Sequence, residues 1–225
     1  MAERGPYGPL LPLGRRGPTV ALSILVVLAA VGVGTVLLVT GTDCRTDRFG
    51  PGSGDGRDPA QPLLVHATPA LDELPRCADR HLRQVADLAV PNPWTPVGAG
   101  ASDGAFTGSY DGGGHRLTGL RAFLPGSDDV GLFGVLAGEV RDLVLEDVVV
   151  VGRDRVGAVA GDVRPGGRVT DVVVRDARIE GAAAVGELAG RAADPTAVTG
   201  RFDGATVARG TGPEVGVDDA TPDDD

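Results

Sequence analysis

The chain has 225 residues, a formal net charge of −10 at pH 7 and few aromatic residues, and all 21 of its basic residues are arginines. An acidic surface repels a phosphate backbone, which argues against nucleic acid as a partner. With aromatic residues scarce and 36 glycines present, the core must be built from Val, Leu and Ala between many tight turns.

The N-terminal part of the sequence predicts a membrane anchor. Residues 1–18 are rich in Pro, Gly and Arg and are expected to form a disordered cytoplasmic tail. Residues 19–40 carry no charge, and a helix of this length covers the roughly 30 Å hydrocarbon core of a bilayer. Arg15 and Arg16 precede it and Asp43 follows, so the positive-inside rule places the N-terminus in the cytoplasm and the C-terminal domain outside the cell membrane. The alternative, a cleaved signal peptide, would have a shorter apolar region that ends at small residues.

The segment after the anchor reads as a flexible linker over residues 41–75, because it is rich in Gly and Pro. The only cysteines, Cys44 and Cys77, would both lie outside, where oxidation favours a disulfide between them. Free or intermolecular thiols are the alternative, and two cysteines are too few for a structural zinc site. The folded domain is expected at residues 76–216, followed by an acidic disordered tail at 217–225.

A repeat with an offset of 29 residues is the main signal: residues 140–161 align with residues 169–190 without a gap. Alternate positions stay apolar in both copies, as at Leu145 and Val174, while the positions between them vary, as at Glu146 and Arg175. A period of two with one dry face is typical of strands. We therefore predict an all-β fold, a short parallel β-helix with a coil of about 29 residues.

Two segments do not follow this simple alternation. Val144 and Val173 are apolar where the alternation points outward, so either something covers them or the register slips there. Residues 79–89 place Leu82, Val85 and nearby alanines on one helical face, which predicts a short helix that caps the N-terminal end of the solenoid.

Glycine and aspartate recur at the expected corners of the coil. Glycine supplies a positive φ or a close backbone approach, and aspartate at a strand edge can bond nearby backbone N–H groups. Stacked aspartates could also hold Ca²⁺ or act in catalysis, but a structural repeat produces the same ladder, so we assign no catalytic, cofactor or metal site. The repeat corner residues are Gly134, Asp142, Asp147, Gly152, Gly157, Gly161, Asp171, Asp176, Gly181, Gly186 and Gly190.

The sequence contains an ordered series of motifs: PWTPVG (93–98), FTGSYDGGGHRLTGL (106–120), GLFG (131–134), VGAVAG (156–161) and VGELAG (185–190). This series resembles the GLUG repeats of bacterial surface proteins, which implies that the predicted anchor lies in a bacterial cell membrane. The resemblance covers about residues 78–216 and implies a β-helical, adhesin-like surface module rather than a reaction. The present array is shorter than those of long adhesive stalks.

The sequence offers little evidence of enzyme chemistry. None of the histidines, His66, His81 and His115, lies in an H-E-x-x-H motif, and Cys77 with His81 falls in the expected cap. We therefore predict a membrane-anchored, non-enzymatic module for surface interaction or scaffolding, without cofactors, whose partner is an extracellular protein or a glycan. The alternatives are an enzyme that acts on surface polysaccharide and a passive spacer.

Overall fold

The computed structural model describes residues 44–99, 104–204 and 206–208. The chain divides into two units, Met1–Thr42 and Asp43–Asp225, and every described residue belongs to the second. The predicted cytoplasmic tail, transmembrane span and acidic tail therefore lie outside the described residues. Within the part that is described, no helix is long and apolar enough to cross a membrane.

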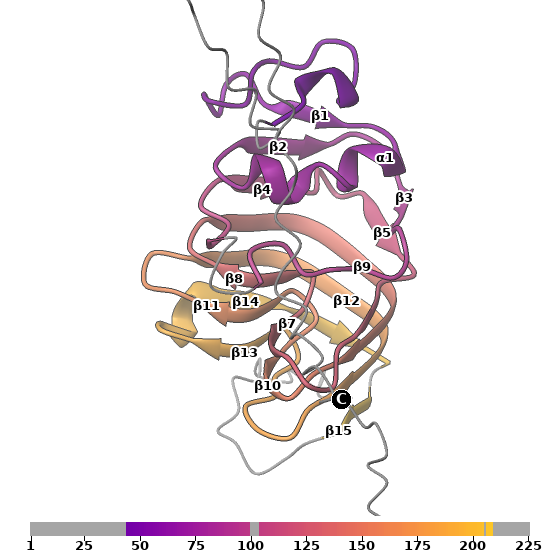
Figure 1. Ribbon diagram of the computed structural model, residues 1–225, viewed down its shortest axis with the longest axis vertical. Helices are drawn as coiled ribbons and strands as arrows, with labels where there is room; N and C mark the ends of the chain where they lie inside the picture. Colours follow the sequence, from indigo (N-terminus) through magenta and orange to yellow (C-terminus); the bar gives the residue numbers. More distant parts are fainter. Residues whose placement is uncertain (1–43, 100–103, 205, 209–225) are drawn as a thin grey trace, which may run out of the picture. The chain divides into compact units, whose positions relative to one another are not determined.

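The described unit is an all-β parallel solenoid of about four turns with little helix (Figure 1). Its short helical turns are η1 (Thr46–Arg48), α1 (Thr68–Leu71), η2 (Leu74–Cys77) and η3 (Pro195–Ala197). Its strands are β1 (Leu63–Val65), β2 (His81–Gln84), β3 (Leu88–Ala89), β4 (Ser109–Asp111), β5 (Arg116–Thr118), β6 (Arg121–Phe123), β7 (Asp128–Val130), β8 (Phe133–Leu136), β9 (Glu139–Val151), β10 (Asp154–Val156), β11 (Ala160–Val163), β12 (Arg168–Glu180), β13 (Ala189–Ala192), β14 (Val198–Asp203) and β15 (Thr206–Ala208).

The strands stack coil on coil. Among the described residues a ten-stranded sheet follows the order β1-β2-β4-β9-β12-β14, and β3, β5, β6 and β15 join it beside the long strands. The returning side of the coil forms the smaller stacks β8-β11-β13 and β7-β10. β9 and β12 pair in parallel from Glu139↔Arg168 to Val151↔Glu180, an offset of 29 residues throughout. The offset read from the sequence is thus one coil.

The alternation of side chains also follows the expectation. Leu145 and Val174 are register partners with no exposed surface, so both belong to one interior column. The register does not slip at Val144 and Val173, which are partners and only half-buried. Arg116 and Arg201 flank this pair in register, and an arginine stem is long enough to cover a neighbouring valine.

The predicted capping helix at residues 79–89 is wrong. That segment forms β2 and β3, with Leu82 and Gln84 buried and Val85 41% exposed. Corners between short strands reset the alternation of inward and outward residues, so the apolar spacing across them imitates that of a helix.

The segment expected to be a flexible linker is folded from Cys44 onward. Its strand β1 pairs with β2 as the first rung of the stack. The loop before β1 covers the free edge of that strand: the Gly50 N–H donates to the Leu64 carbonyl at 2.8 Å, and the Leu64 N–H donates to the Ser53 hydroxyl at 2.9 Å. Phe49, from the same loop, is buried. This loop, rather than a helix, covers the end that a solenoid otherwise leaves open.

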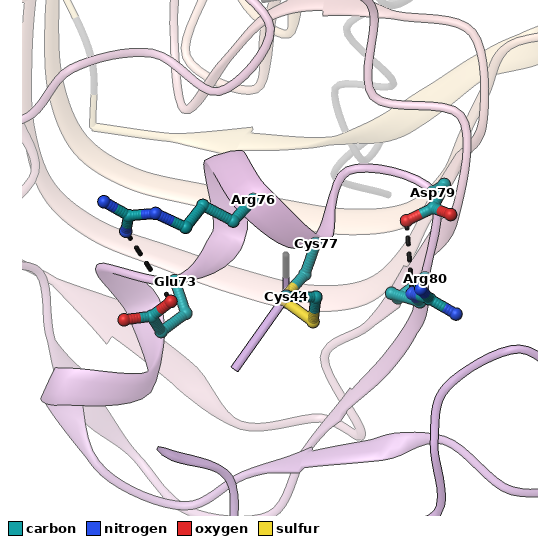
Figure 2. The surroundings of a disulfide bond; sticks show 6 residues. All are labelled: Cys44, Glu73, Arg76, Cys77, Asp79 and Arg80. Atoms are coloured by element: carbon teal, nitrogen blue, oxygen red, sulfur yellow. Dashed lines mark ion pairs between the residues drawn. A yellow bond between two sulfur atoms is a disulfide. The ribbon is translucent and has the colours of Figure 1, made fainter. Parts of the chain in front are cut away.

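A disulfide closes the N-terminal end. Cys44 and Cys77 are bonded with their Cα atoms 4.8 Å apart and a sequence separation of 33 (Figure 2). The bond joins the first described residue to the end of η2, so the covering loop and the first coil are covalently tied. Figure 2 also shows the nearby ion pairs Glu73–Arg76 and Asp79–Arg80.

Candidate interaction surface

The long strands bend at aspartates. The register of β9 with β12 skips these positions, which divide each strand into three straight segments. Asp and Asn enter the left-handed region more readily than other residues with a Cβ, so these side chains are selected as corner residues. Their φ values are 50° at Asp142, 55° at Asp147, 54° at Asp171 and 48° at Asp176.

The repeat glycines serve a different purpose. All seven predicted corner glycines lie in the described part of the chain, and none has a positive φ there. What they allow is close approach. A Cβ on Gly157 would lie 2.7 Å from the Ala189 Cα in the next coil, and one on Gly134 would lie 2.7 Å from the Ala99 Cα. At Gly161 and Gly190 the added carbon would collide with backbone atoms of β7 and β10. At these four glycines the neighbouring backbone comes too close for a Cβ, whereas the positive φ lies at the aspartates.

The returning side of the coil carries a compact ionic cluster. Arg155 pairs with Asp128, Asp129 and Asp154, and Arg153 binds both oxygens of Asp128 at 2.7 and 2.8 Å. The hydrogen bond from Arg153 lowers the pKa of Asp128, and the bond to Asp129 raises the pKa of Arg155. Every charge in this cluster has an opposite partner.

A buried carboxylate lies next to that cluster in β11. Asp162 is only 2% exposed, between Val135 and Arg191 in the register of the stack. Burial alone would raise the pKa of Asp162, but hydrogen bonds from Arg191 and Arg164 outweigh burial and hold it below its ordinary value. The sequence contained the signal for this pair, because Asp162 and Arg191 are 29 residues apart.

The outer face of the large sheet bears charges that pair between coils. Glu146 and Arg175 are register neighbours as predicted, yet Glu146 pairs with Arg116 at 3.5 Å and Arg175 with Asp203 at 3.9 Å. Arg141 binds Asp111 at 2.9 Å in the same manner. Surface charges are thus matched along the stack.

The histidines and Cys77 occupy separate places. The His115 Nδ1 is 3.3 Å from the Asp87 Oδ1, and the backbone N–H of Arg116 lowers the pKa of Asp87. The His81 Nδ1 is 2.8 Å from the Ser109 hydroxyl. Cys77 is in the disulfide. Within the described residues, no group of three or more His, Cys, Asp or Glu is arranged to hold a metal ion.

One part of the outer face is apolar. Phe123 is 70% exposed. It lies in register beside Val151, as Arg121 lies beside Val149. In the next coil Arg178 and Glu180 continue these two columns. We call Phe123, Val149 and Val151, with the charged rim of Arg121, Arg178 and Glu180, the Phe123 patch. Sequence reasoning missed it, because Val149 and Val151 were read only as outward positions that vary between the two copies of the repeat.

The chain is similar to parts of two known proteins. No protein-family model matches the chain, so the resemblance to GLUG repeats stays a prediction. Halomucin from Haloquadratum walsbyi is 32% identical in an alignment of 123 residues, and the match covers 49% of this chain and 1% of Halomucin. A crystal structure from Bacteroides ovatus, described as that of a "putative immunoglobulin A1 protease", aligns over 72% of this chain and 76% of its own, with 12% identity and a TM-score of 0.39. That score is too low to carry an argument about fold or activity.

Proposed function

We propose that the chain is a membrane-anchored, extracytoplasmic β-helical module for surface interaction or scaffolding, adhesin-like and without an enzymatic activity. The observation that carries the proposal is the outer face of the solenoid, where β9 and β12 present rows of side chains locked in register. Each straight segment of these strands presents a regular row of outward side chains, which suits contact with a partner, whereas a catalytic site needs acid, base and substrate to converge in a concavity.

The comparison with Halomucin supports the location. Its name is that of a mucin, a class of extracellular protein, and about half of this chain is similar to one segment of it. The disulfide adds support, because such bonds persist in oxidising compartments outside the cytosol. The apolar segment 19–40 supplies the proposed anchor.

The alternative function, an enzyme acting on surface polysaccharide, rests on one cluster of the outer face. His115 and Asp87 are close enough to share a proton, and Arg116 pairs with Asp87 and Glu146. His, Asp and Arg in that proximity could serve acid–base chemistry. The cluster lies at the outer surface of the sheet, with Asp87 58% exposed at its side chain, so it lacks the shielding from water that usually assists such chemistry.

Labelling of intact cells tests the proposal. Wild-type chain has its two cysteines in the disulfide, so it is the unlabelled control. Ala193→Cys, at an exposed position, should react with a membrane-impermeant maleimide on whole cells, and Ala2→Cys should react only after lysis. Cells that express the full chain should also be retained better than cells that express residues 1–43 on surfaces coated with an extracellular protein or a glycan. The reverse labelling pattern, or equal retention, would refute the proposed function.

A further inference from the structure

We propose that the Phe123 patch binds an uncharged polysaccharide. The inference rests on the proposed function and names the class of partner. Phe123 and Val85 are the two large hydrophobic side chains that are exposed among the described residues. Phe123 is the more exposed of the two, at 70% against 41% for Val85. The ring contacts inside the solenoid, Phe106–Phe133 and Tyr110–Phe133, do not involve it.

The patch has the shape of a platform. Phe123 and Val151 are partners across neighbouring coils, and Val149 lies two residues before Val151 on the same outward side. All three belong to the third straight segment of the coil, where backbone pairing fixes their spacing. Neighbouring coils are about 4.8 Å apart, comparable to the width of a sugar ring. A polysaccharide that ran along the stack could thus place successive rings over successive coils, with the apolar face of one ring on Phe123.

The charges around the platform select against a charged partner. Arg121 binds the Asp147 carboxylate at 2.6 Å, and Arg178 binds Glu180 at 2.6 Å. Each pair is neutral in sum, so a polyanion or polycation would have to break a pair before it gained one. The charged ends of Arg121, Asp147 and Arg178 are exposed and that of Glu180 is half-buried. These groups keep spare N–H donors and oxygen acceptors. The hydroxyl groups of a polysaccharide both donate and accept hydrogen bonds. They can therefore bond to the rim of the patch without breaking its ion pairs.

A hollow of about 500 Å³ continues the platform at the corner that follows it. Val151 and Glu180 belong to both the patch and this hollow, so a chain lying on Phe123 would run into it. Its lining residues are Val151, Gly152, Glu180, Gly181, Ala182 and Ala208.

Affinity electrophoresis of the full chain tests the proposal. The protein is solubilised in a polyoxyethylene detergent, which contains no sugar that could compete. Native gels contain dextran, mannan, xylan or hydroxyethylcellulose as uncharged probes, and alginate as an anionic one. We expect at least one uncharged polymer to retard the wild type, and alginate to retard it less. Phe123→Ala should weaken that retardation about tenfold or more in apparent Kd, as for a truncated aromatic anchor. Phe123→Trp should preserve it.

Two comparisons make the outcome decisive. Val85→Ala removes the other exposed hydrophobic residue and should leave retardation unchanged, and thermal melts of Phe123→Ala and Val85→Ala should match the wild type. Retardation by none of the uncharged polymers, stronger retardation by alginate, or undiminished retardation of Phe123→Ala would each overturn the proposal. If any of these results accompanies surface labelling of Ala193→Cys and cell retention, the patch is wrong while the proposed function stands. If labelling fails as well, both are wrong.

Discussion

The two central coils and the N-terminal end of the solenoid hold together in different ways. β9 and β12 pair along almost their whole length, and their inward residues form continuous buried columns. At the N-terminal end, β1 has three residues, and a loop, three short helical turns and a disulfide surround it. Repeated alternation therefore suffices where a coil has neighbours on both sides. Where one neighbour is missing, a covering loop and a covalent bond replace it.

The largest effect should come from a charge in an interior column. Leu145→Asp or Val174→Asp would bury an unpaired carboxylate, which costs several kcal/mol, out of about 5–15 kcal/mol of total stability for a domain. Each variant should be nearly unfolded in thermal melts followed by circular dichroism. The controls Glu146→Ala and Arg175→Ala change register neighbours on the outer face and should cost less than about 1 kcal/mol. Wild-type melting of either Asp variant would contradict the interior assignment.

Removal of the disulfide should have the next largest effect, and it should be confined to the N-terminal end at first. The bond closes a loop with a sequence separation of 33, for which chain entropy predicts about 3–4 kcal/mol. In Cys44→Ser/Cys77→Ser, hydrogen exchange should quicken in residues 44–66 before it quickens in β9 and β12. An equal loss of protection from hydrogen exchange in residues 44–66 and in β9 and β12 would contradict the difference between these two regions.

The two kinds of corner residue can be separated by substitution. Gly190→Ala would push a Cβ into the backbone of β10, and such overpacking costs about 1–3 kcal/mol. Asp176 has a φ of 48°, so Asp176→Gly relieves a left-handed residue with a Cβ and should change stability by less than about 1 kcal/mol. Urea denaturation of both variants measures the difference. The opposite order would mean that the aspartates, not the glycines, are needed for packing.

The smallest predicted effect is a dependence of the free energy of unfolding on pH, through Asp162. The folded pKa of Asp162 lies below its unfolded value of 3.8. Its contribution to stability is therefore complete above that value and is lost as the pH falls through the folded pKa. Asp162→Asn should be less stable than the wild type at pH 7, and the gap between them should narrow as the pH falls below about 4. Urea midpoints measured at pH 7, 4 and 3 give the comparison, and a gap that widens in acid would contradict it.

Sequence reasoning predicted the part of the fold that repeats. The offset of 29 gave the register of β9 with β12 and the interior column of Leu145 and Val174, because stacked coils must bury equivalent positions. It failed at residues 79–89, where strands too short to show an alternation looked helical, and before Leu63, where glycines looked flexible although the loop is hydrogen-bonded to β1. Neither region has a second copy against which to check a pattern.

The candidate surface was harder to predict than the fold. Phe123 lies in β6, whose pairing with β9 has an offset of 28 residues rather than 29, so the ungapped alignment did not bring Phe123 beside Val151. The same reason hid the partners of Arg155, which are 26 and 27 residues away in β7. Contacts between coils of unequal segment lengths require the structure.

The changing offset has a consequence for how such a molecule can vary. Along the coil that contains β4, β5 and β7, the offset to the next coil is 30 at Asp111↔Arg141, 28 at Arg116↔Val144 and 26 at Asp128↔Asp154. Each change occurs at a corner, while the strands on both sides remain aligned. Extra residues are therefore absorbed as small loops, such as Gly112–His115, without turning any interior side chain outward. Loops of foreign sequence could be inserted at these corners, and the solenoid would then display several peptides at fixed intervals.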